Sequence, residues 1–397
     1  MIQYFWPGAW IIYDGPGITN VLAEAKASVL SLKTVPYQRR WVERLQQVEL
    51  KREIAGTSRI EGAEFTEREL EAAMQETPEQ LVTRSQKQAH AAVQTYRWIA
   101  KLPADRPIDR DLILEIHRRL VTGADDDHCP PGQLRGQDPN VYFGSPRHRG
   151  VDGGDECERA FEAFTQAIQH EYRGHDQIVQ ALAAHYHLAA MHPFLDGNGR
   201  TARALEALML QRAGLRDTSF VAMSNYYYDE KPRYLASLAA TRQGDHDLTP
   251  FLAFALRGIA LQSKRLLDEI QHEISKELFR NLMFDLFTRL KTPRKRVLQD
   301  RQLEILKILL AEEKIEWTAL IERMRAHYNV KNPIKALVRD VNALTALKAV
   351  WVHKISDAPP RFLVGVRLEW PTEVTETEFF ERVRKLPKAK THSFLQQ

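Results

Sequence analysis

Apolar residues recur at helical spacing along most of the chain. They repeat every three or four positions between about residues 21 and 74 and again over residues 91–99, which places them on one face of a helix. An acidic segment, residues 109–111, precedes another such run that ends at Leu120, and acidic side chains favour a helix N-terminus. The pattern predicts a mainly α protein, with further helices at 156–174, 176–191, 199–212 and 234–287 and a loop at 244–247.

Three segments depart from this helical pattern. The first twenty or so residues are rich in Gly, Pro and aromatics and predict an extended arm, and Thr77-Pro78-Glu79 predicts a break between helices. Residues 122–155 lose the helical period and are dominated by Gly, Asp, Pro and His. Within them Val141–Pro146 is short, apolar and β-prone between turn residues, so we expect a small hairpin or flap there.

The C-terminal part has a different layout. A charged, Pro-containing segment, Lys291–Arg296, predicts a linker. Three short helices and two strands are expected after it, at 302–310, 317–324, 332–344, 350–355 and 361–366, the third helix with Asn332 as N-cap. This is the layout of a winged helix-turn-helix. We divide the chain into an N-terminal helical region (1–105), a helical core with the helices that follow it (106–290), and a linker, winged unit and basic tail (291–397).

Composition narrows the class of protein. The chain has 397 residues, of which 44% are hydrophobic and 27% charged, so it is a globular protein and not a disordered one. Its two cysteines, Cys129 and Cys157, exclude a disulfide framework and suit a reducing cytoplasm. No stretch approaches the roughly 18 uncharged apolar residues of a transmembrane helix, and no signal peptide is evident. We therefore expect a cytoplasmic protein without a membrane partner, and the net charge of +4 only hints at a local basic patch.

One segment, Met191–Arg203, brings together residues suited to phosphate chemistry. A Gly-Asn-Gly turn leads into a helix, whose free N–H groups form an anion-binding nest. Arg200 and Arg203 lie in the first turns of that helix and could clamp phosphate oxygens, which would explain cations at a helix N-terminus. Asp196 is suited to Mg²⁺, and His192 to taking a proton from a hydroxyl. Each fragment alone is commonly an ordinary turn or a solvated face; the combination points to function.

This segment resembles the signature of the Fic family, H-x-F-x-[DE]-G-N-G-R-x-x-R, at every defining position. The resemblance extends over helices from about 110 to 262 and implies an all-α Fic-type bundle that moves AMP from ATP to a Tyr, Thr or Ser hydroxyl of a protein. It implies the following roles: His192 as the base, Phe194 as the loop's anchor, Asp196 for Mg²⁺ or Mn²⁺, Gly197, Asn198 and Gly199 for phosphates, with Asn198 at the α-phosphate, Arg200 for the β-phosphate and Arg203 for the γ-phosphate.

Two further segments resemble parts of this family. Val141–Pro146 resembles its target-binding flap, with Phe143 and Gly144 nearest the nucleotide, although an ordinary surface hairpin would have the same pattern. Residues 224–234 resemble the segment that lines the adenine pocket, in which Tyr234 contacts adenine or packs in the core.

Thr57-Ser-Arg-Ile-Glu61-Gly62 resembles the family's inhibitory motif, [ST]-x-x-x-E-[GN], placed N-terminal to the core. The resemblance implies that Thr57, Glu61 and Gly62 belong to an inhibitory helix, whose Glu61 docks on Arg203 at the γ-phosphate position and holds the enzyme idle. In some relatives the same glutamate helps remove AMP, so reversal of the reaction is an alternative activity.

Other groups are set aside or left open. His185 and His187 lack metal-site spacing, and Asp125–Asp127 is interpreted as a solvated turn. In the winged unit, Asp340 interrupts a basic helix face, so its partner could be DNA, through phosphate contacts, or protein. The basic residues concerned are Lys331, Lys335, Arg339, Lys354, Arg361, Arg382, Arg384, Lys385, Lys388 and Lys390.

The leading hypothesis is an autoinhibited protein adenylyltransferase that uses ATP and Mg²⁺, acts on a target protein or on itself, and releases pyrophosphate. Three alternatives remain: AMP removal, another nucleotide donor on the same fold, or a nucleotide-sensing DNA-binding regulator. A homodimer is a further expectation.

Overall fold

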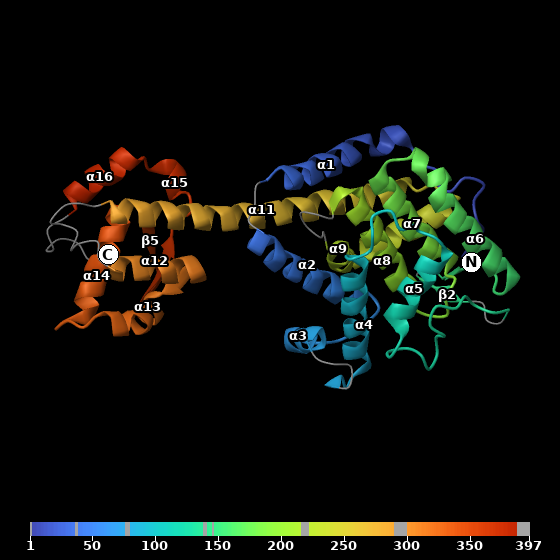
Figure 1. Cartoon of the computed structure of the whole chain (residues 1–397), viewed down its shortest axis with the longest axis horizontal. Coiled ribbons are helices and arrows are strands. Elements are labelled where there is room, and N and C mark those ends of the chain that lie inside the picture. The colour runs from blue at the N-terminus through green and yellow to red at the C-terminus, as the bar shows by residue number, and fades with distance from the viewer. Residues whose placement is uncertain are drawn as a thin grey trace. The chain divides into compact units, whose positions relative to one another are not determined.

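The computed structural model describes residues 2–35, 39–75, 80–137, 141–144, 147–215, 222–289 and 300–386. They form two compact units, residues 1–268 and 269–397, and are mainly helical, as the sequence predicted (Figure 1). The helices of the first unit are α1 (Gly15–Thr34), α2 (Arg39–Ile60), α3 (Glu67–Gln75), α4 (Arg84–Ile99), α5 (Arg110–Val121), α6 (Asp155–Gln169), α7 (Gln177–Met191), α8 (Asn198–Leu210), α9 (Met223–Asp229), α10 (Lys231–Gln243) and α11 (Thr249–Thr288), the last of which continues into the second unit.

The pair α7–α8 is the centre of the first unit. Nearly every side chain of both helices is buried. Apolar residues therefore lie on all sides of α7, as expected of a helix at the centre of a domain. Helices α2, α3, α4 and α5 share a second apolar cluster with the C-terminal part of α8, through side chains such as Ile54, Val93 and Leu208. The short turn between α7 and α8 is thereby held on a rigid base.

A small three-stranded sheet lies beside this turn, in the order β1-β3-β2 (β1, Ile2–Gln3; β2, Tyr142–Phe143; β3, His148–Arg149). The predicted hairpin is confirmed, since Phe143 pairs with His148 in antiparallel register. Its third strand comes from the N-terminal arm and runs parallel to β3. The sequence predicted an extended arm but not its partner, because local pattern does not specify a non-local strand pairing.

Several boundaries differ from the predicted ones. The extended arm ends earlier, because α1 begins at Gly15 with Pro16 in its first turn. The helix expected over 156–174 ends at Gln169, and a 3-10 turn, Glu171–Gly174, follows it. The predicted break at 77–79 and the linker at 291–296 lie outside the described residues.

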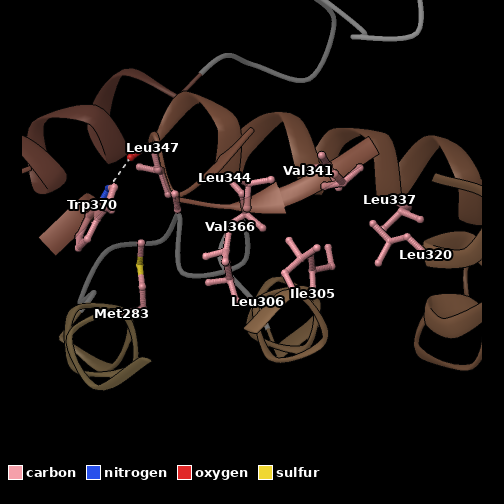
Figure 2. Packing of buried hydrophobic residues seen from close by; sticks show 14 of the residues in the cluster. Met283, Ile305, Leu306, Leu320, Leu337, Val341, Leu344, Leu347, Val366 and Trp370 are labelled. Carbon is pink, nitrogen blue, oxygen red and sulfur yellow. Dashed lines mark hydrogen bonds between the residues drawn. The ribbon is translucent and has the colours of Figure 1, made fainter. Parts of the chain in front are cut away.

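The second unit contains the predicted helices and hairpin. Its elements are α12 (Asp300–Glu312), β4 (Lys314–Glu316), α13 (Trp317–Met324), α14 (Pro333–Ala346), β5 (Val350–Asp357), β6 (Pro360–Val366), α15 (Trp370–Glu373) and α16 (Glu376–Lys385), with the strands in the order β4-β6-β5. Figure 2 shows Leu344 and Val341 of α14 on the side that faces Ile305 and Leu306 of α12, and Met283 of α11 below Trp370. The interpretation of this unit as a winged helix-turn-helix remains a prediction.

None of the helices within the described residues combines the length and apolar character needed to cross a membrane.

Candidate functional site

His192 stands at the end of α7 in the left-handed conformation, with φ of 56°. Its backbone N–H still donates to Leu188, so the residue closes the helix and turns the chain toward α8. Its Nδ1 lies 3.1 Å from the carbonyl oxygen of Ala189. A carbonyl can only accept, so Nδ1 carries the proton and Nε2 is left as the basic nitrogen. Burial lowers the pKa of His192 to about 4, so the imidazole is neutral at neutral pH.

The flap residue Phe143 lies on this imidazole. The two rings are stacked, with centroids 4.0 Å apart and planes 9° from parallel. Gly144 follows in the left-handed region, with φ of 74°. The structure therefore places Phe143 against the predicted base, whereas the expected contact of Phe143 and Gly144 with the nucleotide stays a prediction.

The turn between the two helices is closed by its own side chains. Phe194 is fully buried, and its backbone N–H and carbonyl are both bonded by the Asn198 side chain, at 2.9 and 2.8 Å. The Asn198 amide thus has one N–H beyond these bonds. Helix α8 begins at Asn198, so the N–H groups of Asn198, Gly199 and Arg200 have no acceptor within the helix. They form the anion-binding end of α8.

His117 of α5 contacts this turn through its buried ring. The sequence analysis did not predict this contact. Its ring is stacked on Phe194 at 3.7 Å. Gly132 donates its backbone N–H to His117 Nδ1 at 3.0 Å, so the proton is on Nε2, which lies 3.1 Å from the carbonyl oxygen of Asp196. One buried imidazole therefore holds both the anchor ring and the backbone of the predicted metal ligand. The only signal in the sequence is a histidine on the apolar face of a helix, with no other metal-binding residue at a suitable spacing.

Arg135 is a second residue that was missed. It is 2% exposed, its Nε donates to the carbonyl of His192 at 2.7 Å, and one Nη donates to the carbonyl of Val151 at the same distance. The buried Arg135 guanidinium thereby joins the backbone of the base, His192, to the segment that follows the flap, at Val151.

Asp196 lies in a charged cluster that the sequence predicted only in part. Arg200 bonds to Asp125 at 2.6 Å and approaches Asp196 at 3.3 Å, while His128 Nε2 lies 3.1 Å from the other Asp196 oxygen. Arg84 also contacts both carboxylates. The interpretation of Asp125 as part of a solvated turn is wrong, because its side chain is fully buried and neutralised by these arginines.

The donor set at this cluster fits a divalent cation of the magnesium class. One ligand atom each from Asp125, His128 and Asp196 lie within 4.8 Å of one another. The Asp196 side chain is 37% exposed and retains acceptor capacity, and carboxylate oxygen is the ligand that Mg²⁺ prefers. Burial acts to raise the pKa of Asp196, but the Arg200 charge and hydrogen bonds from the Gly197 N–H and His128 together hold it below its usual range, so Asp196 is ionised.

The end of α2 reaches the anion-binding end of α8. An Arg203 Nη donates to Glu61 Oε1 at 2.6 Å, and its Nε donates to the Thr57 hydroxyl at 2.9 Å. A Cβ placed on Gly199 would lie 2.5 Å from that Glu61 oxygen, so only glycine lets the carboxylate come this close. Glu61 thus occupies space beside the free N–H groups of α8.

Gly62 has a backbone role in this contact. With φ of 89° it stops α2, because its N–H donates to Arg59 and the N–H of Ala63 donates to Ser58. This pair of bonds is a Schellman C-cap, in which glycine is preferred. The cap fixes the position of Glu61, the residue just before it.

Two buried carboxylates in the middle of α2, Glu49 and Glu53, attach this helix to its neighbours. Glu49 is bonded by Arg265 at 2.7 Å. Glu53 accepts from the Tyr96 hydroxyl at 2.8 Å and from both the hydroxyl and the N–H of Ser224, the latter at 2.9 Å. Burial raises the pKa of Glu53 to about 7.

Tyr234 lies in the core and not on an open surface. It is 3% exposed, its hydroxyl is 2.9 Å from His185 Nε2, and its ring stacks on Tyr227. His185 in turn bonds to buried Glu206. We therefore assign no adenine contact to Tyr234.

In the second unit, α14 carries exposed basic residues. Lys331, Lys335 and Arg339 are exposed, whereas Asp340 is buried and bonded by Tyr328 at 2.8 Å. The expectation that Asp340 interrupts the basic face is wrong, because its carboxylate is turned into the core. The hairpin cations are neutralised, Lys354 by Asp357 and Arg361 by Glu316. Lys388 and Lys390 lie outside the described residues.

Comparison with known proteins agrees with this geometry. Residues 107–210 match the Fic/DOC family. The chain is 32% identical over 155 residues to protein adenylyltransferase fic-1 of Caenorhabditis briggsae and 33% identical over 157 residues to protein adenylyltransferase Fic of Aedes aegypti. These matches cover 38% and 39% of this chain and 27% and 28% of the relatives, so the chain spans about a quarter of their length.

Two solved structures share the fold. Fic-1 (residues 134–508) of Caenorhabditis elegans superimposes with a TM-score of 0.54 at 22% identity, covering 65% of this chain and 75% of that one. A Fic family protein from Desulfovibrio desulfuricans G20 does so with a TM-score of 0.53 at 18% identity, covering 92% and 98%. Together with the complete motif around His192 and Asp196, these matches show that residues 107–210 are similar to the Fic/DOC family and that the chain shares the fold of the solved Fic proteins.

Proposed function

We propose that this chain is a protein adenylyltransferase that moves AMP from ATP to a Tyr, Thr or Ser hydroxyl of a target protein or of itself. The observation that carries the proposal is the state of His192. Its neutral imidazole donates from Nδ1 to the Ala189 carbonyl, which leaves Nε2 unprotonated, and the residue lies at the start of the loop that leads to the anion-binding N-terminus of α8. Nε2 takes the hydroxyl proton, the hydroxyl oxygen bonds to the α-phosphorus, and the bond to the β-phosphate breaks to release pyrophosphate.

The N-terminus of α8 supports a triphosphate at this place. The N–H groups of Asn198, Gly199 and Arg200 and the helix dipole favour negative charge. Arg200 and Arg203 add guanidinium groups, which reach the β- and γ-phosphates once they exchange their present carboxylates for phosphate oxygens. Asp196 would hold Mg²⁺, or Mn²⁺ in its place, beside His128. When bound, the cation neutralises charge on the phosphates.

The same contacts support autoinhibition. Glu61 presents its carboxylate to Arg203 and to the end of α8, where the γ-phosphate would otherwise bind. Because the Glu61 carboxylate already occupies the space between Arg203 and Gly199, ATP binds productively only after Glu61 leaves. Thr57 and the Gly62 cap hold Glu61 in that position.

Labelling with ATP that carries ³²P at the α-phosphate tests the proposal. We expect little label on protein with the wild type, strong label with Glu61→Gly, and none with Glu61→Gly combined with His192→Ala. Glu64→Gly, a change at an exposed carboxylate two residues after Gly62, is the matched control and should behave as wild type. Absence of label from Glu61→Gly, with a candidate target mixture and Mg²⁺ present, would reject AMP transfer.

The alternative activities share the same site. If Glu61 orients a water for AMP removal, Glu61→Gly would abolish release of AMP from a modified protein. Competition among nucleotides for the labelling reaction would reveal a different donor. A cytoplasmic location and a homodimer remain predictions.

DNA binding by the second unit is the second candidate function. It is favoured by three exposed basic residues, Lys331 just before α14 and Lys335 and Arg339 within it. The opposite side of this helix packs in the core through Leu337 and Leu344. Cations on one helix face are suited to phosphate contacts.

A further inference from the structure

Arg242, in the last turn of α10, differs from the other buried arginines of the first unit. It is 7% exposed, and its Nε, like that of Arg200, is buried without a hydrogen-bond partner. Arg135 bonds to carbonyls, and Arg200 and Arg203 bond to carboxylates. Within the described residues, no carboxylate pairs with Arg242. Burial of an uncompensated guanidinium is costly, so a specific use must offset it.

The contact that Arg242 does make is with the flap. Its guanidinium carbon lies over the ring of Phe143, 5.3 Å from the centroid, which is cation–π geometry. The same ring is stacked on the His192 imidazole at 4.0 Å. The Phe143 ring of the flap therefore lies between two groups, the Arg242 guanidinium of α10 and the imidazole of the base, His192.

The flap needs such support. Strand β2 has two residues, as do both other strands of its sheet, and so short a sheet is marginal by itself. His192 is fixed by its own helix end and by Arg135. Among the described residues, the Phe143 ring contacts His148 within the hairpin, and His192 and Arg242 outside it.

We propose that Arg242 is a positioning residue for AMP transfer: it holds Phe143 on the His192 ring, and so fixes the flap and the aim of Nε2. The inference rests on the proposed function for its kinetic consequence, but the three-residue arrangement can be tested without it. Arg242 is not assigned any contact with substrate.

Electrostatics agree with this placement. Three charged groups affect His192: Arg135 and Arg242 lower its pKa, and Glu61 raises it, in addition to the larger effect of burial. The Arg242 charge therefore helps to keep the base unprotonated while its planar group packs on Phe143.

The kinetic test uses the Glu61→Gly background. Arg242→Gln and Phe143→Leu should each lower kcat by about tenfold, the loss expected from one cation–π or stacking contact near the reacting atoms, with the KM for ATP unchanged. Because both act through one contact, the double variant should be no slower than the slower single variant. Arg242→Lys should recover part of the loss. Arg233→Gln, an exposed arginine on the same helix, is the matched control.

Losses that multiply in the double variant, or an effect of Arg242→Gln on KM alone, would overturn the proposal. A second measurement holds even if no AMP transfer is found. Imidazole ¹⁵N shifts of His192, assigned by their absence in His192→Ala, should show a higher pKa in Arg242→Gln and an unchanged one in Arg233→Gln. An unchanged His192 pKa in a folded Arg242→Gln protein would refute the arrangement itself.

Discussion

The Glu61 carboxylate accepts a hydrogen bond from Arg203 at 2.6 Å, although 142 positions separate the two residues. The contact joins the end of α2 to the helix that carries the phosphate-binding motif. Its geometry depends on the chain reversal at Gly62, on the Thr57 hydroxyl and on two carboxylates buried along α2.

Gly62→Ala should release the proposed brake in part. At φ of 89° an L side chain is strained by roughly 1 kcal/mol, which weakens the cap that positions Glu61. We expect AMP incorporation severalfold above wild type and below that of Glu61→Gly, measured with α-labelled ATP. Gly123→Ala is the matched control, because Gly123 also has positive φ and open space but lies far from α2 in sequence. Equal stimulation by both changes would attribute the effect to loss of stability alone.

His117→Phe should weaken use of the divalent cation. The new ring keeps the stack on Phe194 but leaves the buried Gly132 N–H unpaired, at a cost of about 1–3 kcal/mol. It also leaves the Asp196 carbonyl with only the weaker contact from the Cys129 thiol. In the Glu61→Gly background we expect the Mg²⁺ concentration for half-maximal transfer to rise several-fold. His90→Phe, which also loses one carbonyl contact but on α4, should leave it unchanged. A fall in rate at an unchanged Mg²⁺ requirement would argue against control of Asp196 by His117.

The pH profile of transfer should reflect the lowered pKa of His192. The active form is the neutral imidazole, so a pKa of about 4 keeps the base competent well below the ordinary histidine range near 6.5. With Glu61→Gly at saturating ATP, kcat should stay level from pH 8 to about pH 5 and then fall. Circular dichroism at each pH separates this fall from acid unfolding. An acid limb centred near 6.5 would contradict the burial of the base.

Glu53 should make stability depend on pH. Its pKa in the folded protein, about 7, lies above the value of 4.5 that a free side chain has, so the folded state binds the additional proton. The free energy of unfolding is therefore highest at low pH and decreases as the pH rises from 4.5 through 7, by about 3 kcal/mol. Chemical denaturation of Glu53→Gln should show a flatter dependence. The exposed Glu64→Gln should keep the wild-type slope, and a slope retained by Glu53→Gln would assign it to another group.

Binding of the full chain to a DNA duplex, measured by fluorescence anisotropy over a salt series, tests the second unit. If α14 contacts phosphates, Lys335→Glu should weaken binding and lower the salt slope by about one. Lys314→Glu, at an exposed position of β4, should have little effect. No binding of any duplex at low salt would leave the exposed face of α14 to a protein partner.

Local pattern in the sequence predicted most of the helices and both hairpins, and it placed residues suited to phosphate chemistry at 192–203. These predictions rest on apolar periodicity, on an acidic helix start at Asp109, on Pro333 at the first position of α14, and on a motif whose residues are close in the chain. The resemblance of residues 57–62 to an inhibitory motif is likewise local, and the structure adds that Gly62 caps α2.

Which distant residues complete the site depends on how the helices and loops pack together, and local pattern does not specify that packing. His117, Arg135 and Arg242 carry no local signature, since a histidine or arginine in a helix or loop has the same pattern whether it is solvated or buried. Their roles come from packing between elements, which brings a ring onto Phe194, a guanidinium onto the His192 carbonyl and another onto Phe143. The same packing buried Asp125 and Asp340, because long-range ion pairs and hydrogen bonds outweigh the local preference of aspartate for solvent.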